Sequence, residues 1–321
     1  MKTLIDVSII IVNYNTRQLT QNCINSIFQH THNVCFEVIV VDNDSTDGSK
    51  EMLSSDARIR YIQSGANLGF GKANNRGYAA AKGKYLFLLN SDTILLNNAI
   101  KLFYDIAEGD ASDVGCWGTM LLDNDGKEAV SYGKFIDLCD DLYLQWIRLP
   151  WSMLTKKPLK VNWYNYPTKG NSYVDYITGA DIFIRKEIAD LYGLFDPAYF
   201  MYFEETDMQR RYASHNIKRR ICTQPMIIHL EGGSQNKKKT NYKMQLIRFK
   251  SKLTYLKKWN STLAYYSYIV ALSLLRIPIV SFYPYPLSYK KEYFKILFNL
   301  KSASNLNGNL NGSKELEHYA S

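Results

Sequence analysis

Cysteine and proline are scarce in this chain, which has 5 Cys and 8 Pro in 321 residues. The cysteines are odd in number and form no CxxC pair, which argues against a disulfide framework or a zinc site and favours a reducing compartment. The apolar segment 7–12 is too short for the core of a secretion signal. No apolar stretch of about 18 residues is free of charge, so we expect a cytoplasmic protein without a spanning helix.

The remaining composition is that of a globular protein, with 46% apolar and 21% charged residues. The net charge of +9 is unevenly distributed. Residues 236–321 hold 15 Lys or Arg and 3 Asp or Glu, a net charge of +12, which leaves −3 for residues 1–235. A slightly acidic body gives no reason to bind nucleic acid, and we expect no such partner.

The basic region predicts a helical extension at 236–301, following a main domain at 1–235 and preceding a flexible tail at 302–321. Its apolar residues recur at helical steps of three and four: Tyr242, Leu246, Phe249, Leu253 and Leu256. A mostly apolar segment, 263–275, follows and is closed by Arg276 and Pro278; it is short for a membrane span. Basic amphipathic helices suit an anionic membrane surface. The alternative is that these helices only pack on the body.

The main domain alternates segments with strand and helix patterns. We expect strands at 7–13, 36–41, 59–63 and 84–89, and helices at 17–30, 47–53, 72–81 and 97–107. This order predicts an α/β fold with a mainly parallel central sheet flanked by helices. Ligands of such sheets bind at the carboxyl ends of the strands, which directs attention to the loops there.

Those loops are rich in amide and carboxylate groups, which suit ribose hydroxyls, a base N–H or a hard cation. Each group also has a purely structural explanation. Asp44 and Asp47 would cap the next helix, Gly69 and Gly71 would form a turn, and Asp92 would be an ordinary turn residue. A dinucleotide-type GxGxxG motif is disfavoured, because Asn stands at position 74 where the third glycine belongs.

The order of these motifs is similar to that of a known family. The segments 7–15 (VSIIIVNYN) and 40–49 (VVDNDSTDGS) resemble the opening strand and nucleotide-binding turn of family 2 glycosyltransferases of the GT-A fold. The segment 67–77 (NLGFGKANNRG) resembles the rhamnosyltransferase-like branch, and 90–92 (NSD) is similar to the DXD metal motif. The remaining motifs follow in family order, at 178–181, 193–197, 203–207 and 229–234. The resemblance covers roughly 5–235 and implies a nucleotide-diphospho-sugar transferase.

The resemblance also implies residue roles. Asp42 would read the base, Asp92 would bind Mg²⁺ or Mn²⁺ at the diphosphate, and His229 would be a second metal ligand or a diphosphate contact. Glu205 would be the catalytic base, with Glu204 and Asp207 as alternatives. The other residues expected to bind the nucleotide-sugar are Asn13, Asn15, Asn43, Asn67, Gly71, Asn74, Asn90, Ser91 and Asp181.

Two positions depart from the family pattern. Asn90 stands where the first Asp of the DXD motif belongs, and an amide gives a metal no charge. Glu205 replaces the commoner Asp, which moves the carboxylate by about one bond length. Structural explanations remain open here too, since Asp207 suits the N-terminus of a helix and a lone His such as His229 often serves packing.

The function expected from the resemblance is an inverting, metal-dependent transfer from a donor such as dTDP-rhamnose or a UDP-hexose. The acceptor would be a hydroxyl of a growing cell-surface glycan, carried on a lipid, with the enzyme in the cytoplasm at the inner face of the membrane. Two alternatives are a nucleotidyltransferase, although the loop after the first strand lacks glycine, and a non-catalytic nucleotide-sugar-binding protein, which Asn90 keeps open.

Overall fold

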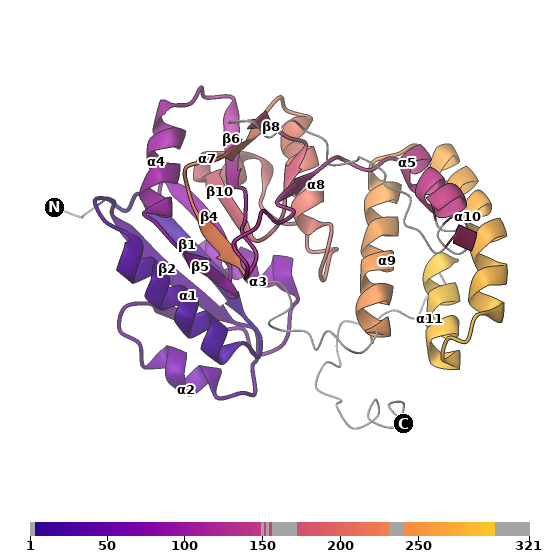
Figure 1. Cartoon of the computed structure of the whole chain (residues 1–321), viewed down its shortest axis with the longest axis horizontal. Helices are drawn as coiled ribbons and strands as arrows, with labels where there is room; N and C mark the ends of the chain where they lie inside the picture. The colour runs from indigo at the N-terminus through magenta and orange to yellow at the C-terminus, as the bar shows by residue number, and fades with distance from the viewer. Residues whose placement is uncertain (1–3, 149–150, 152–153, 156–171, 231–240, 299–321) are drawn as a thin grey trace. The chain divides into compact units, whose positions relative to one another are not determined.

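The computed structural model describes residues 4–148, 151, 154–155, 172–230 and 241–298 (Figure 1). The chain forms two compact units. Unit 1 comprises residues 1–135, 164–197 and 204–239, and unit 2 comprises 136–163, 198–203 and 240–321. The domain bounds expected from the sequence stay a prediction. Unit 2 takes in two segments, 136–163 and 198–203, that lie within the sequence range expected for the first domain.

An eight-stranded sheet forms the centre of unit 1, in the order β3-β2-β1-β4-β10-β6-β11-β8. Strands β1 to β4 run parallel, β6 and β11 are parallel, and β10 is antiparallel to both of its neighbours. The strands are β1 (Val7–Asn13), β2 (Phe36–Asp42), β3 (Arg60–Gln63), β4 (Tyr85–Asn90), β6 (Val114–Thr119), β8 (Ser172–Tyr173), β10 (Asp181–Arg185) and β11 (Lys218–Cys222). The expected α/β fold with a mainly parallel central sheet is confirmed.

Helices cover both faces of this sheet because its central strands are apolar on both sides. Ile9 and Ile11 face a core that includes Ile24 and Phe103, whereas Ile10 faces the core that holds Met208. The helices of unit 1 are α1 (Arg17–His30), α2 (Ser49–Ser54), α3 (Phe70–Ala80), α4 (Ala99–Gly109), α7 (Lys186–Tyr192) and α8 (Glu204–Ala213). The predicted helix 17–30 and strand 7–13 match their observed bounds, and the other predicted boundaries differ from the observed ones by at most two residues.

Two small antiparallel sheets join distant parts of the chain. Strand β5 (Thr93–Leu95) pairs with β12 (Ile227–His229), and β7 (Tyr132–Gly133) pairs with β9 (Tyr176–Ile177). The first pairing brings the segment after β4 against the end of the main domain, which no local pattern predicts.

Unit 2 is built from helices, and its described part contains α5 (Leu138–Tyr143), a π-helix (Leu144–Arg148), α9 (Tyr242–Lys258), α10 (Thr262–Phe282) and α11 (Leu287–Leu297). Leu246, Leu253 and Leu256 of α9 are buried in its core, as the apolar periodicity predicted. The predicted tail, 302–321, lies outside the described residues.

Helix α10 is longer than expected. The sequence predicted an end near Arg276 and Pro278, but the helix continues through Pro278 to Phe282. Val280, beyond the proline, is only 1% exposed in the core of unit 2, and this packing offsets the hydrogen bond that Pro278 cannot make. Within the described residues, α10 is the one helix that is long enough and apolar enough to cross a membrane. Core helices of soluble proteins pass the same test.

Candidate active site

The predicted site residues lie at one edge of the large sheet, where the parallel strands end. Asn13 at the end of β1 lies beside Asp42 at the end of β2, and Val12 lies beside Asn90 at the end of β4. Strand β10 runs the opposite way, so its first residue, Asp181, reaches the same edge. The register of the sheet therefore gathers residues from four strands.

Asn13 is completely buried and uses its whole side chain within the protein. Its Nδ2 donates to Asp42 Oδ1 and to Ser45 Oγ, both at 2.9 Å. Its Oδ1 accepts from Thr16 Oγ1 at 2.9 Å and from Thr20 Oγ1 at 2.7 Å. Because an amide side chain offers two donors and two acceptor positions, Asn13 is saturated and acts by positioning Asp42.

Asp42 is also completely buried and already holds three partners. Besides Asn13, Ser45 Oγ donates to its carboxylate at 2.5 Å and Tyr61 OH at 3.1 Å. Burial and the neighbouring Asp42 charge raise the pKa of Tyr61, which keeps its phenol protonated as a donor. The role of Asp42 in recognising the nucleotide base stays a prediction. Its three hydrogen bonds give this carboxylate a fixed orientation.

Asparagines tie the loops after β1, β2 and β3 together. Asn43 Nδ2 donates to Asn67 Oδ1 at 3.0 Å and to the Gly69 carbonyl at 3.3 Å, and Asn43 Oδ1 accepts from Leu68 N at 2.9 Å. Asn15 adopts a left-handed φ of 53° and accepts from Thr46 N at 2.8 Å. These contacts fix the turn that the sequence assigned to the nucleotide.

The start of α3 approaches the acidic helix α8 closely. Gly69 has a φ of 83°, which favours glycine. A Cβ on Gly71 would lie 3.2 Å from Phe195 Cβ and 3.5 Å from Glu204 Cβ, so a larger residue would push these elements apart. Asn74, only 1% exposed, donates to the Phe70 carbonyl within α3.

The predicted metal ligands are brought together by the pairing of β5 with β12. Asp92 Oδ1 lies 3.2 Å from His229 Nε2, although the two residues are far apart in sequence. Asn90 Nδ2 lies 3.4 Å from the same ring nitrogen. Ser91 Oγ contacts Thr16 Oγ1 at 3.1 Å.

This arrangement fits a divalent cation. Neighbouring ligands of an octahedral ion with bonds of about 2.1 Å lie about 3 Å apart, close to the Asp92–His229 distance of 3.2 Å. No group of three or more His, Cys, Asp or Glu side chains gathers as a metal site in the described part of the chain. Further ligands would therefore have to come from a bound diphosphate or water.

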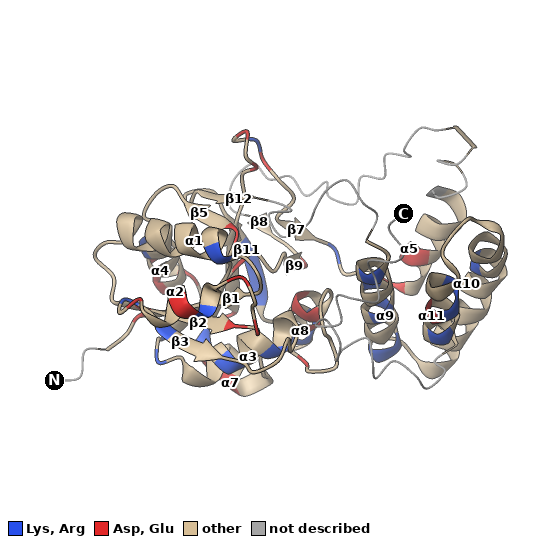
Figure 2. Cartoon of the chain, turned by 90° about the horizontal axis from the view of Figure 1, so that it is seen from below, with Lys and Arg blue, Asp and Glu red and all other residues tan. Residues whose placement is uncertain are grey.

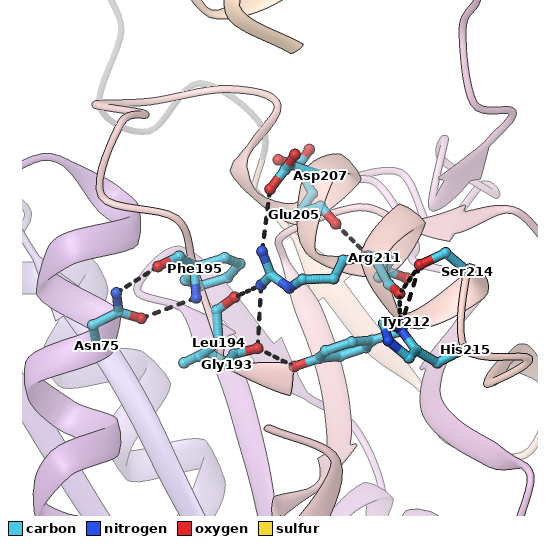
Figure 3. Close-up of polar contacts among 11 residues, drawn as sticks. Asn75, Gly193, Leu194, Phe195, Glu205, Asp207, Arg211, Tyr212, Ser214 and His215 are labelled. Atoms are coloured by element: carbon cyan, nitrogen blue, oxygen red, sulfur yellow. Dashed lines mark hydrogen bonds and ion pairs between the residues drawn. The ribbon is translucent and has the colours of Figure 1, made fainter. Parts of the chain in front are cut away.

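Three acids, Glu204, Glu205 and Asp207, occupy the first turn of α8, and they differ in environment. Asp207 is completely buried and pairs with Arg211 Nη1 at 3.4 Å. The same guanidinium donates to the carbonyls of Gly193 and Leu194 (Figure 3). These contacts favour the structural explanation for Asp207, which secures the loop before α8.

Glu205 is the most accessible of the three acids, since it is half-buried whereas Glu204 is only 3% exposed. A Cβ added to Gly179 would lie 4.0 Å from the Cγ of Glu205. Gln209 fixes this turn, because its side chain pairs with both the N–H and the carbonyl of Ile177 at 2.8 Å and donates to the Glu205 carbonyl at 3.1 Å. Helix α8 is thus held firmly against β9.

Asp181 lies at the sheet edge but is completely buried. Its Oδ2 accepts from Thr119 N at 2.7 Å, and its Oδ1 has no hydrogen-bond partner among the described residues. Burial raises the pKa of Asp181 well above its ordinary value, and the hydrogen bond from Thr119 N opposes this shift.

Three groups lie close together at this edge of the sheet: the turn of Asp42, the pair Asp92–His229 and the acidic start of α8. Thr16 joins the first two groups, because it bonds to both Asn13 and Ser91. The backbone N–H of Asn90 donates to the Ala180 carbonyl at 3.0 Å, and a Cβ built on the neighbouring Gly179 would lie 4.0 Å from Glu205 Cγ.

Several residues that shape the site were not predicted from the sequence. Thr16 stands at the N-cap position of α1 but makes no capping hydrogen bond with its side chain, which links Asn13 to Ser91. The side chain of Asn75 donates to the Phe195 carbonyl at 2.8 Å and accepts from Phe195 N at 3.1 Å, although the two residues are 120 positions apart (Figure 3). The one available signal for Asn75 is a polar residue inside an Ala-rich helix.

Comparisons with known proteins agree with this geometry. Residues 8–166 match the model of the family described as Glycosyl transferase family 2. Glycosyltransferase GlyG of Streptococcus pneumoniae is 31% identical over 112 residues, 34% of this chain and 37% of GlyG. The hexosyltransferase Agl10 of low-salt glycan biosynthesis in Haloferax volcanii is 25% identical over 249 residues, 75% of this chain and 72% of Agl10.

The matched segments cover only 37%, 19% and 28% of the first three curated relatives. Among solved structures, GalNAc-T7 with UDP, GalNAc and Mn²⁺ superimposes with a TM-score of 0.59 and 17% identity, over 94% of this chain and 57% of that one. At that identity the likeness speaks for the fold. Together, the matches support a family 2 glycosyltransferase with a GT-A fold.

Proposed function

We propose that the chain transfers a sugar from a nucleotide-diphospho-sugar to a glycan hydroxyl, with inversion and with help from a divalent cation. The observation that carries this proposal is the proximity of three groups at one edge of the sheet. They are the turn of Asp42, the pair Asp92–His229 and the start of α8 with the carboxylate Glu205. A single displacement needs a donor site, a means of neutralising the leaving diphosphate and a base, and these three groups supply them.

The donor would lie along the loops after β1, β2 and β3. Asn43, Asn67 and Asn15 hold these loops in one shape, so that binding would require little reordering. The name of Agl10 is consistent with hexosyl transfer. Of the two expected donor types, a UDP-hexose is therefore our first choice, and dTDP-rhamnose of the rhamnosyltransferase-like branch is the second.

The acceptor hydroxyl would attack from the side of Glu205. The bond from the acceptor oxygen to the anomeric carbon forms as the bond to the diphosphate breaks, the diphosphate leaves with the electron pair, and Glu205 takes the hydroxyl proton. Gln209 holds the turn that carries Glu205 through its bonds to Ile177. Glu204 and Asp207 are second choices, since both are more deeply buried.

Asp92 and His229 would hold the cation, as the spacing of their ligand atoms allows. A bound Mg²⁺ or Mn²⁺ would act as a Lewis acid that neutralises the leaving diphosphate. Asn90 would contribute an amide rather than a charge, so metal binding would depend strongly on the donor's own phosphates.

We propose a lipid-linked, growing cell-surface glycan as the acceptor and a cytoplasmic enzyme at the inner face of the membrane. The role of Agl10 in glycan biosynthesis supports the first part. The net charge of +12 on residues 236–321 supports the second, because an anionic leaflet attracts it.

The test incubates the full chain with a panel of UDP-hexoses and dTDP-rhamnose, with Mn²⁺, Mg²⁺ or a chelator. We expect metal-dependent release of the nucleoside diphosphate from one donor, and the opposite anomeric configuration in the product by NMR. Donor binding without turnover would favour the non-catalytic alternative. Release of pyrophosphate from a nucleoside triphosphate and a sugar phosphate would favour the nucleotidyltransferase.

A matched pair of variants tests the base. Glu205→Gln keeps the shape of the side chain but cannot accept the proton. Glu187→Gln makes the same change in the first turn of α7, where the glutamate is exposed. We expect the first variant alone to lose turnover while both bind the donor, and equal activity in both would remove Glu205 from this role.

A further inference from the structure

Helix α10 of unit 2 carries an exposed apolar face. Leu263, Tyr266, Val270 and Leu274 follow one another at steps of three, four and four, and are 80%, 53%, 62% and 68% exposed. These steps place the four side chains on one side of the helix. Together they form what we call the apolar stripe, a contiguous row rather than the singly scattered apolar residues of an ordinary surface.

The opposite face of α10 is fixed within unit 2. Tyr265, Tyr268 and Leu272 are buried in its core, and Tyr268 OH donates to Asp141 Oδ2 at 2.7 Å. Asp141 in turn pairs with Lys252 of α9 at 2.7 Å. A helix held by this buried polar network packs along its bundle, and its apolar stripe faces away from that core.

A cavity with three lysines lies beside the stripe. It has a volume of about 290 Å³ between α9, α10 and α11, and its lining includes Lys250, Lys257, Lys295, Tyr266 and Phe298. Tyr266 belongs to both the cavity and the stripe. Lys295 also pairs with Glu292 at 2.5 Å, which leaves the lining with an excess of positive charge. We call this cavity the lysine pocket.

The charge of the surrounding helices matches the pocket. Lys and Arg are prominent on α9 and α11 (Figure 2), and α9 ends with Lys257 and Lys258 in its last turn. Lysines beside an exposed apolar face can place their stems on the apolar layer and their ammonium groups at phosphate level. A soluble partner protein would not require this combination of cations and outward aliphatic side chains.

We propose that unit 2 docks on an anionic phospholipid bilayer, with the apolar stripe in the interface and a lipid phosphate in the lysine pocket. The stripe supplies burial of apolar area, and the pocket supplies selectivity for a charged headgroup over a zwitterionic one. The proposal does not depend on the transferase activity of unit 1, because lipid binding is measured directly.

The first test is sedimentation of the full chain with vesicles of phosphatidylcholine, with and without phosphatidylglycerol. We expect binding to the anionic vesicles that weakens at about 1 M salt, where screening is nearly complete. Leu274→Glu should lower the affinity at least roughly tenfold, since it places a charge in the apolar layer. Leu191→Glu, at a 71% exposed leucine of α7, is the matched control and should bind like the unchanged chain.

The second test addresses the pocket. Each of Lys250→Gln and Lys257→Gln should weaken binding to anionic vesicles roughly fivefold, whereas Lys127→Gln, at an exposed lysine of unit 1, should not. Short-chain phosphatidic acid should stabilise the unchanged chain in a thermal shift, and both pocket variants should lose this effect. Inorganic phosphate and short-chain phosphatidylcholine should give none.

Three results would overturn the proposal. The first is equal binding to zwitterionic and anionic vesicles, and the second is equal stabilisation by inorganic phosphate, which would make the pocket a general anion site. The third is a dimer in light scattering that Leu274→Glu dissociates without changing vesicle binding, because a second copy of the chain would then cover the stripe. Circular dichroism of each variant checks that it is folded.

Discussion

The buried ion pair of unit 2 offers the sharpest test of what holds the C-terminal helices together. Lys252 Nζ lies 2.7 and 2.9 Å from the two oxygens of Asp141, and Tyr268 OH donates to the same carboxylate. The side chains of Lys252 and Asp141 are 14% and 3% exposed. Asp141→Leu would remove the acceptor of both donors and leave an ammonium group buried without its partner.

Breaking a buried pair in this way costs roughly 3–5 kcal/mol, much more than an exposed pair contributes. The remaining 14% exposure of Lys252 moves the expected loss toward the lower end. Burial lowers the pKa of Lys252 below its ordinary 10.5, and Asp141 opposes this shift. Without Asp141, the pKa of Lys252 in the folded state falls further. Between that pKa and 10.5 only the unfolded chain keeps the proton on Lys252. The loss of folding stability should therefore shrink as the pH rises toward 10.5.

The measurement is hydrogen exchange of peptides from α9 and α10, with urea titration of the full chain. Adding Lys252→Met to Asp141→Leu removes the isolated charge and should restore most of the lost stability. Lys101→Met, which breaks an exposed pair with Asp105 in unit 1, is the control and should cost about 0.5 kcal/mol or less. The reasoning fails if the double variant is as unstable as Asp141→Leu, or if that variant is no less stable than the control.

Four variants of unit 1 have expected outcomes of their own. Glu205→Gln should lower kcat by roughly 10²–10⁴-fold with an unchanged donor affinity by calorimetry, which distinguishes a lost base from a lost donor contact. Asp92→Ala should abolish the response of activity to Mn²⁺, and His229→Ala should raise the Mn²⁺ concentration needed for half-activation; a normal titration in either variant would contradict its place at the metal. Gly77→Ala should destabilise unit 1 by about 1–3 kcal/mol in a thermal melt, since its Cβ would lie 2.4 Å from Ile10 Cγ2.

Local patterns predicted the elements of unit 1 well because its core segments are strongly periodic. The β-branched run 7–13 became a strand buried on both faces, and the helix 17–30 has the observed bounds. The polar loops after these strands also lie at one edge, as the rule for parallel sheets predicts. The fold class and the neighbourhood of the site were thus available before any coordinates.

The hydrogen-bond partners and the exposure of each polar side chain could not be predicted in the same way. The sequence does not show that Asn13 makes all its hydrogen bonds within the protein, whereas Glu205 is partly exposed to solvent. The pairing of Thr93 with His229, which carries Asp92 to the histidine, depends on contacts between segments far apart in the chain. Pro278 misled the helix prediction for the same reason, because the packing of Val280 overrides a local penalty.

The turn before Glu204 gives the clearest case of distant control over a local conformation. Tyr202 and Phe203 both have a φ near +70°, at 69° and 68°, which costs roughly 1–3 kcal/mol for each non-glycine residue. Contacts within unit 2 stabilise these two strained conformations. Arg248 Cζ lies 4.4 Å from the centroid of the Tyr202 ring, and the ring centroids of Phe203 and Tyr255 are 5.4 Å apart.

Arg248 and Tyr255 both belong to α9, a helix of the basic C-terminal region. The conformation of Tyr202 and Phe203 therefore depends on a helix that lies far along the chain within the same unit. A chain shortened before α9 would lose these contacts, so we expect Tyr202 and Phe203 to leave the left-handed region and relax to ordinary backbone angles.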